Sequence, residues 1–218
     1  MVNKNRAIAL LIAVLCIFAA MSAGCKKEES YYDKKVGIFA RENKTAKDID
    51  IVFLGDSLTD FYNVTQYFPS YKVLNRGIAG DTTDGLLKRL EVSVYKVKPK
   101  VATLLIGINN ITTMFRDYED ILKDLNKNIP DAKIVVISLL PTNKACAGYN
   151  ELIAESNKNV KALAEKYDCI YADLNALLTD AETGMAKDEY TVDDGLHISV
   201  AGYEVITEYL SGIFSNLI

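Results

Sequence analysis

Histidine is almost absent from this chain, whose 218 residues include a single one at position 197. If an imidazole is to act as a general base near pH 7, only His197 can supply it. Cysteine is scarce as well, and the four cysteines do not cluster. With one histidine and no cysteine cluster, the chain lacks the ligand set of a structural or catalytic zinc site.

Long apolar runs are also rare, and the clearest one stands at the N-terminus. Lys4 and Arg6 precede an uncharged, mostly apolar run over residues 7–24, and charged residues follow from position 26. This order is typical of a secretory signal. Residues 22–25 read Ser-Ala-Gly-Cys and resemble the processing site of bacterial lipoproteins, which predicts a signal peptide over residues 1–24 and a lipid on Cys25.

An alternative stays open because the run of 18 residues is close to the shortest helix that spans a bilayer. It could be an uncleaved anchor, or the protein could be secreted without a lipid. The lipoprotein interpretation places the protein outside the cytoplasm, on the periplasmic or cell-surface side of a bacterial membrane.

An excess of positive charge is missing too. The net charge is −4, and removal of Lys4 and Arg6 with the signal would lower it to −6. Phosphate binding needs a basic face, so this charge disfavours nucleic acid as a partner. Residues 25–48 are rich in Lys, Glu, Asp and Asn and predict a flexible polar tether, followed by one domain over residues 49–218.

Two cysteines remain in that domain. An oxidising compartment would allow Cys146 and Cys169 to pair. Cys169 belongs to a predicted strand, which favours a buried free thiol instead.

Short apolar runs alternate with segments of helical periodicity from residue 49 onward. The predicted strands are residues 49–54, 71–75, 101–106, 133–139 and 169–172. The predicted helices are residues 82–95, 118–128, 150–167 and 200–217, the last with Ser199 as its N-cap. Alternating strands and helices predict an α/β fold, a three-layer α/β/α sandwich around a parallel sheet of about five strands.

Polar motifs follow the first three predicted strands and precede the last helix. Ser57 follows the first strand, Gly80 the second and Asn109 the third. Because reactive groups gather at the carboxyl ends of parallel strands, we expect these three residues to meet at one edge of the sheet. Taken singly, each motif could be only a turn or a helix start.

Together, the motifs at residues 55–59, 75–83, 107–110 and 194–197 resemble the four blocks of the SGNH, or GDSL-like, hydrolase family. Within it the chain is similar to the branch that includes platelet-activating-factor acetylhydrolases and lysophospholipase-like or arylesterase-like proteins. The resemblance implies a flavodoxin-like fold and a serine esterase. It also implies the catalytic residues Ser57, Asp194 and His197, and an oxyanion hole made by Ser57, Gly80 and Asn109. Asp193 is the alternative to Asp194, which has the family's spacing to the histidine.

The chain departs from the family pattern at Asn110, where aspartate is more common, and at Phe61, where a glycine is common. Several apolar residues near the motifs could line an acyl pocket or belong to the core: Phe61, Tyr62, Ile111, Met114 and Phe115. We expect the loops at residues 142–149 and 179–193 to border the site.

The compact domain, which has no insertion large enough for a lid, and the extracytoplasmic signal lead to the hypothesis of a lipid-anchored esterase that removes acetyl or short acyl groups, with carbohydrate as a candidate alcohol. Its partners would be a small-molecule or carbohydrate ester and, through the lipid, a membrane; no metal or organic cofactor is implied. The alternatives are a lysophospholipase or thioesterase acting on longer chains, and a carbohydrate-binding lipoprotein without activity.

Overall fold

The computed structural model describes residues 29–218. The expected signal peptide at residues 1–24 and the expected lipid site at Cys25 lie outside the described residues. The chain divides into residues 1–34 and a compact unit of residues 35–218, which holds the sheet. Among the described residues, no helix combines the length and the apolar character needed to cross a bilayer.

The sheet has five parallel strands in the order β2-β1-β3-β4-β5, which confirms the predicted α/β fold class. The strands are β1 (Ile51–Gly55), β2 (Val73–Gly77), β3 (Val101–Leu105), β4 (Lys133–Ile137) and β5 (Ile170–Ala172). Gly55 at the end of β1 pairs with Gly77 of β2 and Leu105 of β3, so these three strands end at the same level. The strand order reverses at β1, and such a switch point opens a crevice beyond the strand ends.

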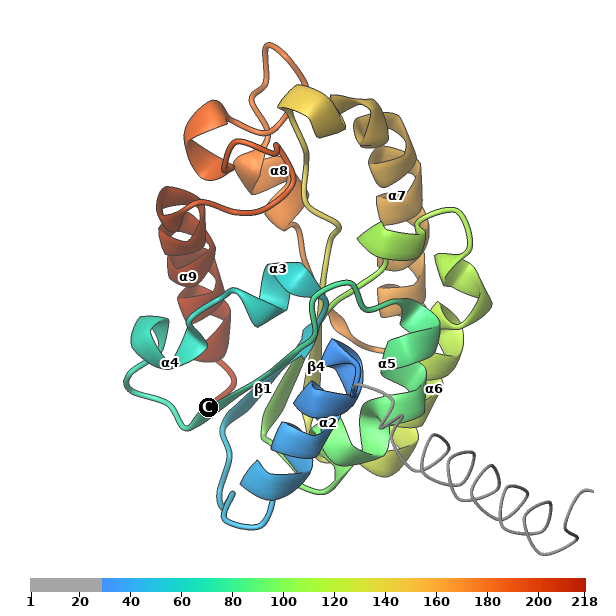
Figure 1. Cartoon of the computed structure of the whole chain (residues 1–218), viewed down its shortest axis with the longest axis vertical. Helices are drawn as coiled ribbons and strands as arrows, with labels where there is room; N and C mark the ends of the chain where they lie inside the picture. Colours follow the sequence, from blue (N-terminus) through green and yellow to red (C-terminus); the bar gives the residue numbers. More distant parts are fainter. Residues whose placement is uncertain (1–28) are drawn as a thin grey trace, which may run out of the picture. The chain divides into compact units, whose positions relative to one another are not determined.

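Helices cover both faces of this sheet, with α5 and α6 on one side and α9 on the other (Figure 1). The α-helices are α2 (Tyr31–Glu42), α3 (Ser57–Asp60), α4 (Val64–Tyr67), α5 (Thr83–Leu90), α6 (Tyr118–Asn128), α7 (Asn150–Lys166), α8 (Leu174–Leu178) and α9 (Val200–Phe214). A π-helical turn, η1 (Glu91–Tyr95), follows α5. The short 3-10 helices are η2 (Ile108–Asn110), η3 (Met114–Arg116), η4 (Lys144–Tyr149) and η5 (Asp188–Tyr190).

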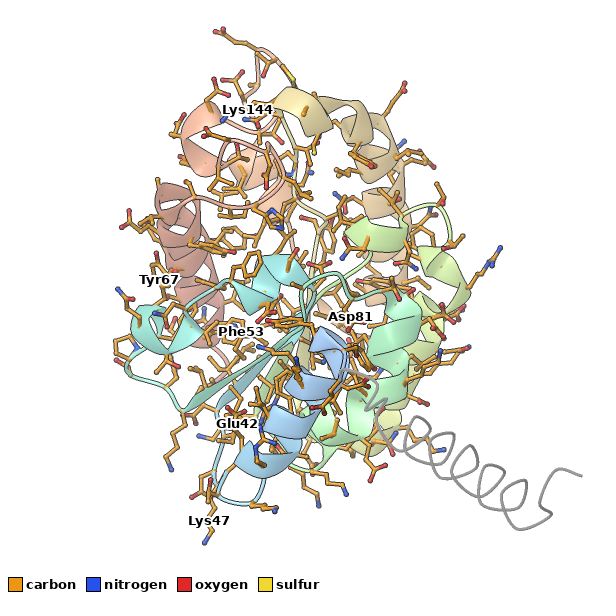
Figure 2. All side chains as sticks on the ribbon, viewed as in Figure 1. Glu42, Lys47, Phe53, Tyr67, Asp81 and Lys144 are labelled. Carbon is orange, nitrogen blue, oxygen red and sulfur yellow. The ribbon has the colours of Figure 1, made fainter. Side chains whose placement is uncertain are left out.

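Part of the core forms where β1 meets α9. Every residue of β1 is buried, as expected of a central parallel strand. The ring of Phe53, labelled in Figure 2, stacks on Phe68 at 5.3 Å and meets Phe214 of α9 edge-on at 6.0 Å. Ser199 caps α9 as predicted, since its hydroxyl accepts a hydrogen bond of 3.1 Å from the amide of Gly202.

The prediction of a flexible polar tether up to residue 48 is wrong for much of that segment. Residues 31–42 form α2, and Phe39 is its one buried residue. The guanidinium of Arg76 lies 4.7 Å from the Phe39 ring and pairs with Glu42. The sequence of this segment is polar because α2 buries only one narrow face. The compact unit accordingly begins at Lys35, within α2.

The two remaining cysteines are free and partly buried, which confirms the free-thiol interpretation. Cys169 immediately precedes β5. Burial raises the pKa of its thiol to about 11, so this cysteine is a weak nucleophile near pH 7.

Candidate active site

Ser57 is the first residue of α3, directly beyond the end of β1. The chain turns sharply here because Asp56 caps the helix, accepting a hydrogen bond of 3.0 Å from the amide of Leu58. The first N–H groups of a helix have no acceptor within the helix. The backbone N–H of Ser57 is therefore placed to bind an anion beside its own hydroxyl.

The only histidine of the chain lies against this serine. His197 Nε2 is 3.0 Å from Ser57 Oγ, and His197 Nδ1 is 2.6 Å from Asp194 Oδ2. Asp194 Oδ1 also accepts the amides of Leu196 at 2.8 Å and His197 at 2.9 Å. The structure thus joins three residues from opposite ends of the domain into one hydrogen-bonded chain.

Asp194 is held in its ionised form. Partial burial raises the pKa of its carboxyl, but the hydrogen bonds from the His197 ring and from the two backbone amides outweigh this and lower it to about 2. An ionised carboxylate at Nδ1 fixes the tautomer that leaves Nε2 as the acceptor facing the serine. Asp193, the alternative to Asp194, is fully exposed, and its Oδ1 lies 3.8 Å from Nζ of Lys144.

A buried asparagine anchors the loop that carries Asp194 and His197. Gly195 has φ of +74°, and a Cβ there would stand 2.1 Å from the carbonyl oxygen of Asn143. The backbone N–H of Asn143 donates to the Gly195 carbonyl at 2.9 Å, and the side-chain oxygen of Asn143 accepts a hydrogen bond of 2.8 Å from the Thr191 hydroxyl. Since a side chain at position 195 would push the loops apart, glycine permits the close approach that fixes His197.

Gly80 lies beyond the end of β2 and Asn109 beyond the end of β3, the two strands that flank β1. Gly80 is exposed with φ of +78°, a conformation that favours glycine, and no heavy atom from outside its own stretch of chain lies within 4 Å of where a Cβ would stand. The side-chain amide of Asn109 donates to the Asp81 carbonyl at 2.8 Å. An amide nitrogen carries two hydrogens, so this bond orients Asn109 and leaves a second donor.

Asn110, one of the departures from the family pattern, supports the same edge. Its amide donates to the Thr83 hydroxyl at 2.9 Å, and its oxygen lies 3.4 Å from the Thr83 amide. An asparagine can both donate and accept here, whereas an ionised aspartate could only accept. The residue that follows Asn109 therefore ties η2 to the start of α5.

A buried arginine connects the strand ends below the site. Arg89 donates to the Asp81 carboxylate at 2.7 Å, to the Gly55 carbonyl at 3.0 Å and to the Arg76 carbonyl at 2.8 Å. Asp81, labelled in Figure 2, is the residue whose carbonyl holds Asn109. One guanidinium thus links the ends of β1 and β2 to the segment between Gly80 and α5.

The predicted pocket residues divide into two groups. Tyr62, Ile111 and Met114 are buried in the core. Phe61 is 56% exposed, and its ring centroid lies 5.2 Å from that of His197. Phe115 is also at the surface, and it packs against Tyr118.

The sequence interpretation missed the supporting residues Arg89, Asn143 and Tyr203. Tyr203 of α9 donates its hydroxyl to the Leu58 carbonyl at 2.9 Å and so fixes α3. A signal existed for Arg89, which falls on the same face of its helix as the buried Leu86, three residues earlier. Asn143 stands in a loop, where no periodicity marks a buried side chain.

Comparison with known proteins agrees with this geometry. Residues 53–205 match the model of the GDSL-like Lipase/Acylhydrolase family. The chain is 28% identical over 186 residues to the rat (Rattus norvegicus) platelet-activating factor acetylhydrolase IB subunit alpha1, covering 79% of this chain and 78% of the relative.

Solved structures agree as well. A Streptococcus pneumonia protein named for platelet activating factor is 27% identical with a TM-score of 0.77, covering 94% of this chain and 99% of the other. An acetylxylan esterase from Geobacillus stearothermophilus shares the fold at 19% identity and a TM-score of 0.60, covering 78% and 95%. With its family model matched over most of the domain, the chain belongs to the GDSL-like lipase/acylhydrolase family, a family of carboxylic ester hydrolases.

Proposed function

We propose that this protein is a serine esterase that removes acetyl and other short acyl groups through an acyl-enzyme on Ser57. The observation that carries the proposal is the hydrogen-bonded chain from Ser57 through His197 to Asp194. Asn109 stands in η2, shortly beyond the end of β3, and β3 ends level with β1. These are the parts that acyl transfer requires: a nucleophile, a base with its orienting carboxylate, and a donor for negative charge.

In the first half of the reaction, His197 Nε2 accepts the hydroxyl proton as Ser57 Oγ attacks the ester carbonyl carbon. Asp194 stabilises the imidazolium that forms. The carbonyl oxygen becomes an anion, which the backbone N–H groups of Ser57 and Gly80 and the Asn109 amide bind. The alcohol oxygen then takes the proton from Nε2 as its bond to carbon breaks.

The second half repeats these steps with water. His197 accepts a proton from the water molecule as its oxygen attacks the acyl-enzyme carbonyl carbon. The intermediate collapses, the proton returns to Ser57 Oγ, and the carboxylic acid leaves. The same donors stabilise the oxyanion twice, and each is worth about 3 kcal/mol of transition-state stabilisation.

Packing behind the nucleophile supports short acyl groups. The hollow beneath α3, lined by Leu58, Leu105 and Tyr203 among others, has a volume of only about 20 Å³. This is close to the ~10–15 Å³ that a cavity needs to hold one water molecule, so no acyl chain fits behind the nucleophile. The rat relative and the Geobacillus protein are both named for removing acetyl groups, which also supports acetyl as the acyl group.

An ester series with one alcohol and acyl chains of increasing length tests the acyl preference. We expect kcat/KM to be highest for acetyl or propionyl esters and Ser57→Ala to be inactive on all. A long-chain pocket would add about 0.8 kcal/mol of binding for each buried methylene. A flat or rising profile beyond about eight carbons would therefore contradict the short-acyl proposal and favour the lysophospholipase or thioesterase alternative.

We also propose that a lipid on Cys25 anchors the protein to a bacterial membrane. The support is the order of charged and apolar residues before Cys25 in the sequence. Cys25→Ala should release the protein from the membrane fraction without changing ester turnover. Retention of that variant in the membrane would instead indicate an uncleaved anchor.

A further inference from the structure

Phe61 presents an apolar ring to solvent directly beside the catalytic histidine. Its side chain is 56% exposed, the most exposed phenylalanine among the described residues, and its ring centroid is 5.2 Å from that of His197. The family pattern often has glycine here, so the ring is a feature of this chain rather than a requirement of the fold. An exposed aromatic ring in this position is available to pack on a bound substrate.

Local geometry brings Phe61 to the nucleophile as well. The amide of Phe61 donates to the Ser57 carbonyl at 3.0 Å, closing the single turn of α3. Residues four apart on a helix lie on the same face. Ser57, His197 and Phe61 therefore form one continuous surface.

The mechanism determines which part of the ester meets this surface. The oxyanion points to the donors at Ser57, Gly80 and Asn109, so the remaining directions belong to the acyl group and the leaving alcohol. His197 Nε2 must reach the alcohol oxygen to return the proton. The carbons attached to that oxygen then lie next to the ring that packs on His197.

Phe61 also lines a hollow whose wall is mostly polar. It has a volume of about 400 Å³ and is lined by Phe61, by residues of α2 and β2, and by several polar side chains: Lys35, Glu42, Asp60, Asn63 and Asn75. Its size is within the usual range for small-molecule sites. Lys35 and Asp60 form an ion pair of 2.6 Å in its wall, which suits hydroxyl groups better than an alkyl chain.

We propose that Phe61 is a binding platform for the alcohol part of the substrate, and that this alcohol is a sugar ring whose hydroxyl groups enter the polar hollow. One face of a pyranose ring carries C–H groups that pack on an aromatic ring, while its edges carry hydroxyls. This inference rests on the proposed esterase function. It makes Phe61 a specificity-determining residue for the alcohol.

The test compares three acetates that differ only in the alcohol: a monoacetylated methyl xylopyranoside, glycerol monoacetate and octyl acetate. Phe61→Ala should lower kcat/KM for the sugar ester about tenfold, mainly through KM, and that for glycerol monoacetate less than threefold. Phe61→Trp should retain the preference for the sugar. The control is Tyr209→Ala, which removes an exposed aromatic ring of α9 and should leave kcat/KM unchanged for all three esters.

An equal fall for all three esters would overturn the inference, because it would mean that Phe61 only orients His197. A larger fall for octyl acetate than for the sugar ester would also overturn it and indicate an alkyl-binding surface. The proposed function fails separately, and the inference with it, if the wild-type protein hydrolyses none of the three. If the wild type hydrolyses them all and Phe61→Ala keeps their ratios, only the platform is refuted.

Discussion

Replacing Asn109 with alanine should remove one donor from the oxyanion hole while leaving the domain folded. The side chain is exposed, and its amide donates to the Asp81 carbonyl at 2.8 Å. Loss of such a hydrogen bond lowers the free energy of unfolding by only about 1 kcal/mol. Loss of one preorganised oxyanion donor costs about 3 to 4 kcal/mol of transition-state stabilisation, or about 10²- to 10³-fold in kcat. Asn109→Ala should therefore lower kcat far more than it lowers the free energy of unfolding.

The assay is initial-rate hydrolysis of an acetyl ester, with urea denaturation of the same protein samples. Asn109→Ala should lower kcat by the stated factor with little change in KM, because the donor acts on charge that develops in the transition state. Asn110→Ala is the matched control, since it removes the neighbouring amide, which contacts Thr83. We expect it to reduce stability but to lower kcat less than about tenfold, well short of the loss of an oxyanion donor.

Two results would refute this reasoning. A loss of less than about fivefold in Asn109→Ala, equivalent to under 1 kcal/mol, would mean that Asn109 does not bind the oxyanion. An equal loss of kcat in both variants would mean that the asparagines act only by holding the loop.

Three further outcomes are expected. Asp194→Asn should lower kcat about 10³- to 10⁴-fold in initial-rate assays, because an amide no longer fixes the His197 tautomer, and near wild-type rates would contradict this role. Burial raises the pKa of Asp56 to about 7, so the stability that its protonated carboxyl contributes is full below about pH 4 and is lost as the pH rises towards 7. In urea titrations across this range, Asp56→Asn should remove up to about 3 to 4 kcal/mol of the fall in the free energy of unfolding. A fall as steep as that of the wild-type protein would refute the assignment. Arg89→Met leaves the Asp81 carboxylate buried without its cation and should lower the free energy of unfolding by about 3 to 5 kcal/mol, whereas a loss below about 1 kcal/mol would contradict the linking role of the arginine.

The sheet and the longer helices were predictable because their signals are local. β1 and β3 are buried on both faces, so each is a short continuous apolar run. The helix expected at residues 82–95 is present, but its last turn widens into η1. The strand-end rule likewise anticipated that Ser57 and Asn109 would lie at one edge, although they are 52 positions apart in the sequence.

What the sequence did not reveal depends on contacts between distant segments. A charged composition concealed α2, because a single buried Phe39 is too weak a pattern to mark a helix face. Four-residue α3 has no periodicity at all, yet it orients Ser57 and Phe61. Asn143 holds the loop of His197 only through tertiary hydrogen bonds, which no sequence period records.

Covalent labelling with a serine-directed fluorophosphonate, followed by peptide mass spectrometry, tests the central claim most directly. Phosphonylation should occur on Ser57 in the wild-type protein and be absent in Ser57→Ala. It should be strongly slowed in His197→Ala, because the chain has no second histidine to accept the proton. Folded wild-type protein that carries no adduct on Ser57, or that is labelled equally well without His197, would contradict the account.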